Sequence, residues 1–136
     1  MEIKDYSPYR PREILAMYEN AGWSNYTRAP EMLRRAYENS LCALGAYEDG
    51  RLVGIIRAVG DGASVVFIQD LLVLSEYRRR GVGTALVRAL AERYPEVYQF
   101  ELLSDDTEGN AAFYSSLGFS RAKEYGCVSY MKMRRP

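Results

Sequence analysis

The stretch from Val65 to Leu103 constrains the fold of this chain most, because it predicts a strand, a helix and a second strand in succession. Val65 to Leu74 is a long and almost wholly apolar run, and Tyr98 to Leu103 is predicted as the next strand. Between them, apolar residues recur at the spacing of a helix with one buried face, at Val82, Ala85, Leu86, Ala89 and Leu90. Such a unit crosses over in the right-handed sense, so the two strands are expected to lie parallel.

Antiparallel strands are predicted ahead of this unit. Leu41 to Tyr47 and Leu52 to Val59 are apolar runs joined by the turn Glu48-Asp49-Gly50, and Asp61-Gly62 marks a second tight turn. Three strands joined in this way form an antiparallel meander that ends in the run from residue 65.

Helices and further strands are predicted towards both ends of the chain. Residues at helical spacing follow Pro11 and again Pro30, with an aromatic loop from Trp23 to Tyr26 between them. A short helix over residues 111–117 is followed by two last strands, 119–123 and 128–133, and by a solvated tail, Arg134-Arg135-Pro136. We therefore predict one α/β domain over residues 1–136, with a mixed, largely antiparallel sheet and about four flanking helices.

Charge and residue types exclude several classes of function. The chain has 18 basic and 18 acidic residues, and a net charge of zero argues against binding nucleic acid by bulk phosphate neutralisation. It contains no histidine, which removes Ser-His and Cys-His nucleophilic catalysis and histidine-ligated metal sites. We expect no nucleic-acid partner and no metal, and proton chemistry must use carboxylates, tyrosines, cysteines, lysines or water.

The cysteines and the apolar runs bear on the compartment. Cys42 and Cys127 form no paired motif, which favours reduced thiols over a disulfide framework. The charged start, Met1-Glu2-Ile3-Lys4-Asp5, lacks the apolar core of a signal peptide, and the longest apolar runs are too short to cross a bilayer. A cytoplasmic protein without a membrane partner is expected.

The loop between the strand and the helix carries the chemistry. The first turn of a helix has unpaired N–H groups and a partial positive charge, so it can receive an anion. Gly81 and Gly83 lack the Cβ atoms that would keep a phosphate off the backbone, and three arginines, 78 to 80, add positive charge. Neither a Walker A pattern nor GxGxxG is present. The pattern alone also suits a glycine-rich turn with solvated arginines, or a nucleotide-binding loop.

Two motifs resemble those of a known family. Arg78-x-x-Gly81-x-Gly83, after Leu71 to Tyr77, looks like the acyl-CoA-binding motif of the GNAT N-acetyltransferases. Phe113-Tyr114-Ser115-Ser116-Leu117-Gly118-Phe119 resembles an element that these enzymes carry near the C-terminal end. The motifs occur in the family's order and separation, so the resemblance covers essentially the whole chain. It implies the GNAT fold, in which a central parallel strand pair splays into a V.

The resemblance implies acetyl-CoA as the acyl-donor cosubstrate. In the family, backbone amides of this loop hold the pyrophosphate, the end of the preceding strand pairs with the pantetheine arm, and an N–H near Val73 would polarise the acyl carbonyl. Thr107 stands where the family often has an asparagine, although Asp105 to Glu108 also indicates a helix start. The cofactor-binding residues implied are Leu71, Val73, Arg78, Arg79, Arg80, Gly81, Val82, Gly83, Thr84 and Thr107.

Tyr114 matches a tyrosine that often lies close to the cofactor sulfur in this family, which implies a catalytic role. The alternative is an aromatic residue of the core. A phenol of pKa about 10 giving its proton to a thiolate of pKa about 8.5 is uphill by roughly 2 kcal/mol. We therefore expect Tyr114 to stabilise the leaving thiolate by a hydrogen bond rather than by full proton transfer.

Gln69 and Asp70 interrupt the apolar strand before the motif. A period of two puts them on opposite faces unless a bulge intervenes. Many relatives, including the spermidine/spermine acetyltransferases, have a Glu-Asp pair at this place, so Gln69 puts a glutamate base in doubt. Asp70 is predicted as a catalytic-site carboxylate that binds the acceptor or positions water, with a purely structural aspartate as the alternative. Glu101 is a weaker candidate.

The predicted activity is transfer of an acetyl group from acetyl-CoA to a primary amine, on a small molecule, by direct attack without an acyl-enzyme. The alternatives are a peptide or protein-lysine acetyltransferase, and a non-catalytic acyl-CoA sensor, which the departures at Gln69 and Thr107 leave open. Trp23 and Tyr26 match the region that covers the acceptor in the family, although packing on the core is the simpler role. Homodimers are common in the family, so the resemblance allows one here.

Overall fold

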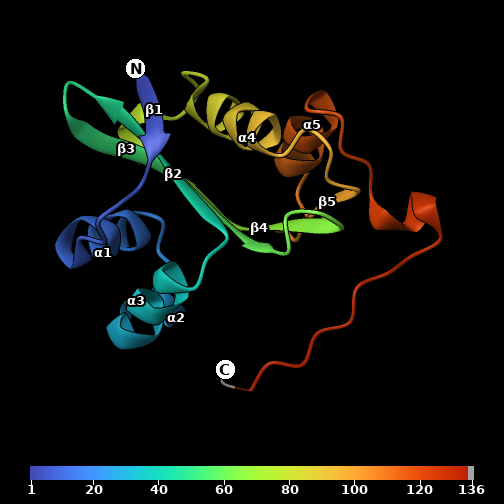
Figure 1. The fold of residues 1–136 in the computed structure, drawn as a ribbon, viewed down its shortest axis with the longest axis horizontal. Coiled ribbons are helices and arrows are strands. Elements are labelled where there is room, and N and C mark those ends of the chain that lie inside the picture. The colour runs from blue at the N-terminus through green and yellow to red at the C-terminus, as the bar shows by residue number, and fades with distance from the viewer. Residues whose placement is uncertain (135–136) are drawn as a thin grey trace. The chain divides into compact units, whose positions relative to one another are not determined.

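The computed structural model describes residues 1–134 and contains one five-stranded mixed sheet (Figure 1). The chain divides into two units, Met1–Leu103 and Ser104–Pro136. Arg135 and Pro136, the end of the predicted solvated tail, lie outside the described residues.

The strands of the first unit follow chain order across the sheet. They are β1 (Glu2–Asp5), β2 (Cys42–Glu48), β3 (Arg51–Gly60), β4 (Val65–Val73) and β5 (Gln99–Leu102). β1 to β4 are antiparallel neighbours, whereas β4 and β5 form the parallel pair predicted from the crossover. β1 was not predicted, because three of its four residues are charged types that are rare in strands.

Four helices of the first unit cover the two faces of the sheet. α1 (Pro11–Asn20), α2 (Ser24–Thr27) and α3 (Pro30–Glu38) lie on one side, and α4 (Val82–Arg93) lies on the other (Figure 1). α1 and α3 begin at the prolines that predicted them. α2 is a short helix where an aromatic loop was expected. α4 lies so close to β3 that a Cβ on Gly54 would come within 2.8 Å of Val82 Cγ1.

The core of the first unit is centred on β3. Helices cover the sheet on both sides, so β3 is a nearly continuous apolar run with buried residues Leu52, Val53, Ile55, Ile56 and Ala58. Two charged side chains break this pattern. Arg57 of β3 and Asp70 of β4 are both buried and stand opposite each other in the register. Asp70 lines the pocket of the candidate site, and Arg57 binds Asp70.

The second unit corrects the two last strands that the sequence predicted. It contains α5 (Glu108–Ser116) and a 3₁₀ turn, η2 (Ala122–Tyr125), and none of its described residues forms a strand over 119–123 or 128–133. Local hydrogen bonds from the N–H groups of Gly126 and Cys127 close the turn at η2. Apolar alternation makes a strand only where a neighbouring strand pairs with it. Among the described residues, the parallel pair therefore lies at the end of the sheet.

Candidate functional site

β4 and β5 separate halfway along β4. Their parallel register joins Val65–Ile68 to Gln99–Leu102, and β4 continues to Val73 beyond this pairing. From residue 69 onward, that side of β4 has no strand partner in the part of the chain that the structure describes. Leu71 and Val73, the positions predicted to pair with pantetheine, lie on this stretch.

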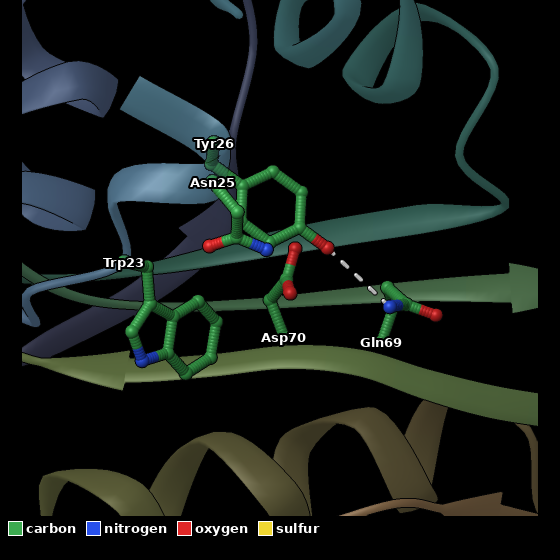
Figure 2. Close-up of a pocket in the computed structure, with 5 residues that line it drawn as sticks. All are labelled: Trp23, Asn25, Tyr26, Gln69 and Asp70. Atoms are coloured by element: carbon green, nitrogen blue, oxygen red, sulfur yellow. Dashed lines mark hydrogen bonds between the residues drawn. The ribbon is translucent and has the colours of Figure 1, made fainter. Parts of the chain in front are cut away.

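A bulge at Gln69 brings two consecutive side chains to one place. In the register of β3 with β4, Arg57 pairs with Asp70 and Ala58 with Ile68, so Gln69 has no partner. As a result, Gln69 and Asp70 both line the same pocket rather than facing opposite sides of the sheet (Figure 2).

The pocket at this bulge is open and has a volume of about 260 Å³. Its lining residues are Trp23, Asn25, Tyr26, Gln69 and Asp70 (Figure 2). The hydroxyl of Tyr26 lies 3.4 Å from Nε2 of Gln69, which donates to it. The rings of Trp23 and Tyr26 also pack against Tyr18, with centroid distances of 5.9 and 5.1 Å. The two residues thus pack on the core and line the pocket at once.

Asp70 is held firmly by one of its two carboxylate oxygens. Its Oδ2 accepts hydrogen bonds from the Tyr18 hydroxyl at 2.7 Å and from Arg57 Nε at 2.8 Å. Its Oδ1 is also buried and accepts no hydrogen bond from any described residue. Buried polar atoms in native proteins nearly always have a partner. The unpaired oxygen at a pocket wall therefore marks a place for a hydrogen-bond donor of a ligand.

Arg57, Tyr18 and Tyr37, which surround the Asp70 carboxylate, keep one protonation state around neutral pH. Burial alone would lower the pKa of Arg57, but the charge and hydrogen bond of Asp70 outweigh it and raise that pKa. Burial raises the pKa of Tyr18 and also that of Tyr37, whose hydroxyl lies 2.9 Å from the Tyr18 hydroxyl. Arg57 lies over the Tyr37 ring at 5.4 Å. At neutral pH, Asp70 thus faces a guanidinium cation and two neutral phenols.

These tyrosines predict a loss of stability in alkali. The unfolded chain releases their protons as the pH passes about 10, whereas the folded chain retains them, so the free energy of unfolding falls above pH 10. Each such tyrosine contributes a slope of up to about 1.4 kcal/mol per pH unit. Urea unfolding between pH 9 and 11.5 measures the slope, and Tyr18→Phe is expected to make it shallower. Tyr98→Phe, at a residue 80% exposed, serves as the control. Equal slopes in both variants and the wild type would contradict this account.

The loop before α4 has the backbone of an anion site. Arg79 and Gly81 have left-handed φ values of 64° and 81°, and a Cβ at Gly81 would meet nothing within 4 Å. No capping side chain accepts a hydrogen bond at the start of α4, so its first N–H groups, up to Thr84, stay available to an anion. A non-glycine residue in the left-handed region is strained, and such strain collects at binding sites. The loop therefore fits a diphosphate group.

The arginine side chains surround this loop. Arg78, Arg79 and Arg80 are exposed. Nε of Arg78 donates to the Val73 carbonyl at 3.4 Å, and Arg80 lies over the Tyr77 ring at 5.1 Å. A fourth arginine was not predicted: Arg51 of β3 lies over the same ring at 5.8 Å and forms an ion pair with Glu76. Val82 and Gly83 can contribute only backbone groups, since Val82 is buried against the sheet.

Tyr114 and Thr107 belong to the second unit. The ring of Tyr114, in α5, lies 4.9 Å from the ring of Phe113 and 5.9 Å from that of Phe119, and burial raises the pKa of Tyr114. Thr107 is the N-cap of α5, with its hydroxyl accepting from the N–H of Asn110 at 3.1 Å. This confirms the helix-start signal, although the helix begins three residues before the predicted Ala111.

Position distinguishes the remaining residues. Glu101 of β5 is exposed and does not line the pocket. Sequence reasoning missed Tyr18, Asn25 and Arg57, which line or support the pocket. No group of three or more Cys, Asp or Glu side chains among residues 1–134 is arranged to hold a metal ion. Within the same residues, every helix is too short or too polar to span a membrane.

Comparisons with known proteins agree on one family. The model of the Acetyltransferase (GNAT) family matches residues 7–119. A GNAT family acetyltransferase from Streptococcus pneumoniae TIGR4 is 37% identical, with a TM-score of 0.88 over 99% of this chain and 98% of that chain. The PaiA N-acetyltransferase from Thermoplasma acidophilum, solved in complex with coenzyme A, is 18% identical. The match covers 88% of this chain and 89% of that chain, with a TM-score of 0.75. At this identity the likeness shows a shared fold and nothing further.

A curated relative extends well beyond this chain. The mycothiol acetyltransferase of Kineococcus radiotolerans is 37% identical over 92 residues, which are 66% of this chain and 30% of that protein. The chain thus spans less than a third of that relative. The family model covers most of the chain, and the pneumococcal structure matches nearly all of it at 37% identity. This chain therefore belongs to the GNAT family of acetyltransferases.

Proposed function

We propose that this chain transfers the acetyl group of acetyl-CoA to a primary amine on a small molecule. The observation that carries the choice of acceptor is the pocket at the β4 bulge, with the unpaired Oδ1 of Asp70 at its wall. A volume of about 260 Å³ lies near the small end of ligand pockets, which favours a small acceptor over a folded protein.

The donor side of the proposal rests on β4 and the loop before α4. When bound, acetyl-CoA supplies a thioester. The N–H groups from Arg79 to Thr84 hold its pyrophosphate, with positive charge from the neighbouring arginines, and Leu71 and Val73 pair with its pantetheine arm. An N–H near Val73 polarises the acyl carbonyl, and one such donor is typically worth about 2.7–4 kcal/mol in the rate. Thr107 shapes the entry to α5 as its N-cap.

The chemistry is one direct displacement. The acceptor nitrogen bonds to the carbonyl carbon as the carbon–sulfur bond breaks, the nitrogen loses a proton, and the leaving sulfur gains one. Tyr114, whose pKa burial raises, stays protonated and donates a hydrogen bond to that sulfur. An amine of pKa about 10.4 is neutral in only about one part in 10³ to 10⁴ at pH 7, a penalty near 4.6 kcal/mol. Asp70 binds the acceptor, and water takes up the proton that the acceptor nitrogen loses.

The proposal extends to the organisation of the protein. One acetyltransferase domain over residues 1–136 is part of the proposal. The two cysteines, Cys42 and Cys127, are both free thiols, which supports a cytoplasmic enzyme. A homodimer stays a prediction from the family resemblance.

Calorimetry and a panel of amines test the function. We expect acetyl-CoA and CoA to bind and ATP not to bind, and thiol release to depend on small primary amines rather than on a lysine peptide. Tight CoA binding without thiol release in the presence of any amine would identify a sensor, and faster release with the peptide would identify a protein acetyltransferase.

Tyr114→Phe is expected to lower turnover where chemistry limits the rate. Wild-type turnover in that variant rejects the role of Tyr114.

A further inference from the structure

The pocket at the β4 bulge has an unusual set of polar groups. Its lining consists of one carboxylate, two side-chain amides and two aromatic rings, and no basic side chain is among these residues. The carboxylate of Asp70 points toward the side chains of Asn25 and Tyr26 (Figure 2). Arg57 binds the other oxygen of this carboxylate, Oδ2, at 2.8 Å and is not one of the lining residues.

Each of these groups favours a positively charged occupant. An ionised carboxylate only accepts hydrogen bonds, so the partner that Oδ1 lacks must be a donor. A buried polar atom without a partner is unfavourable, and a bound donor would remove that penalty. Tryptophan and tyrosine rings attract cations, and both Trp23 and Tyr26 line the pocket. The amide oxygens of Asn25 and Gln69 add further acceptors.

We propose that this pocket binds the ammonium form of the acceptor, with Oδ1 of Asp70 as its hydrogen-bond acceptor, and that it selects amines without a carboxylate beside the amino group. The inference rests on the proposed function, since it names the acceptor class of the same site. An α-amino acid would bring its carboxylate close to Asp70. Arg57 is already bound to Oδ2 of Asp70 and does not line the pocket, so no lining residue offers a cation to the second carboxylate. Simple alkylamines lack that charge.

Entry of the amine requires a small side-chain movement. Asp70 lines the pocket but its Oδ1 is buried, so the amine must displace a neighbouring group to reach it. Tyr26 is the group suited to move. Its hydroxyl is tied to Gln69 by a long bond of 3.4 Å, and its helix α2 has only four residues.

Trp23 makes binding directly visible, because it is the only tryptophan in the chain and lines the pocket. We expect 3-methylbutylamine to change the Trp23 fluorescence at concentrations at least ten-fold lower than leucine, which has the same side chain plus a carboxylate. The titration is made with the full chain, with and without CoA. Equal binding of the two compounds overturns the inference.

Charge changes at Gln69 sharpen the test without disturbing the buried pair of Arg57 and Asp70. Gln69 is exposed, so its variants are expected to fold. Gln69→Glu should tighten binding of 3-methylbutylamine several-fold, and Gln69→Lys should weaken it at least ten-fold. Gln99→Lys adds the same charge at an exposed position of β5 outside the pocket, and should leave binding unchanged. Equal effects of the two lysine variants overturn the inference.

The outcomes separate this inference from the proposed function. If 3-methylbutylamine is acetylated but neither compound changes the Trp23 fluorescence, the pocket holds water only. The inference then fails while the proposed function stands. If fluorescence shows the expected charge dependence but no amine is acetylated, the cation site stands and the proposed function fails.

Discussion

Replacing Arg57 alone with methionine is expected to lower the free energy of unfolding by about 3–5 kcal/mol, since it strands a buried charge. The side chains of Arg57 and Asp70 are 5% and 1% exposed, and Nε lies 2.8 Å from Oδ2. Without Arg57, the carboxylate keeps only the Tyr18 hydroxyl as a donor. Removing both charges in Arg57→Met/Asp70→Val is expected to be far less destabilising, because paired buried ions are often replaced by apolar groups at little loss.

Urea unfolding of the two single variants and the double variant gives the coupling energy between Arg57 and Asp70. Arg93→Met is the matched control, because Arg93 forms a 3.0 Å ion pair with Asp5 whose side chains are 45% and 68% exposed. A surface pair of this kind is worth about 0–1 kcal/mol. If Arg57→Met is no more destabilising than Arg93→Met, the burial of the Asp70 charge is wrong.

The crossover around α4 could be predicted because its signals are local. The apolar stripe of α4 and the glycines before it depend on neighbours a few residues away, and the right-handed crossover rule then orders β4 and β5. The turn at Asp49 and Gly50 is another example, since both residues adopt the left-handed φ that an Asp-Gly turn requires. The last two predicted strands failed for the opposite reason. An alternating pattern over 128–133 shows that a segment can pair, but the pairing itself depends on a distant partner.

Only part of the candidate site could be predicted from the sequence. Asp70 stood out as a buried acid, yet its cation did not, although Arg57 interrupts an apolar run in the same way. That interruption was the available signal. Tyr18 has no such signal, because a tyrosine on the apolar face of a helix is equally suited to packing. The bulge at Gln69 depends on the register between β3 and β4, which no single strand reveals.

Gly81→Ala is expected to weaken binding of acetyl-CoA at least ten-fold. Gly81 has a φ of 81°, and an alanine in the left-handed region is unfavourable by about 1–2 kcal/mol. The added methyl group would meet no protein atom within 4 Å, so it lies in the open space where a phosphate is proposed to approach the backbone. The variant therefore tests the anion site rather than the packing of the chain. Calorimetry with acetyl-CoA measures the loss.

Gly50→Ala is the matched control for backbone strain. Gly50 also has a φ of 81° and nothing within 4 Å of its missing Cβ, but it lies in the turn between β2 and β3. Both variants should lose a similar free energy of unfolding, and only Gly81→Ala should lose affinity for acetyl-CoA. A similar drop in affinity in both would mean that strain in the fold, rather than the loop before α4, governs binding. Unchanged affinity in both would mean that the diphosphate does not bind at this loop, because a methyl group at Gly81 cannot share the space of a phosphate held on the backbone.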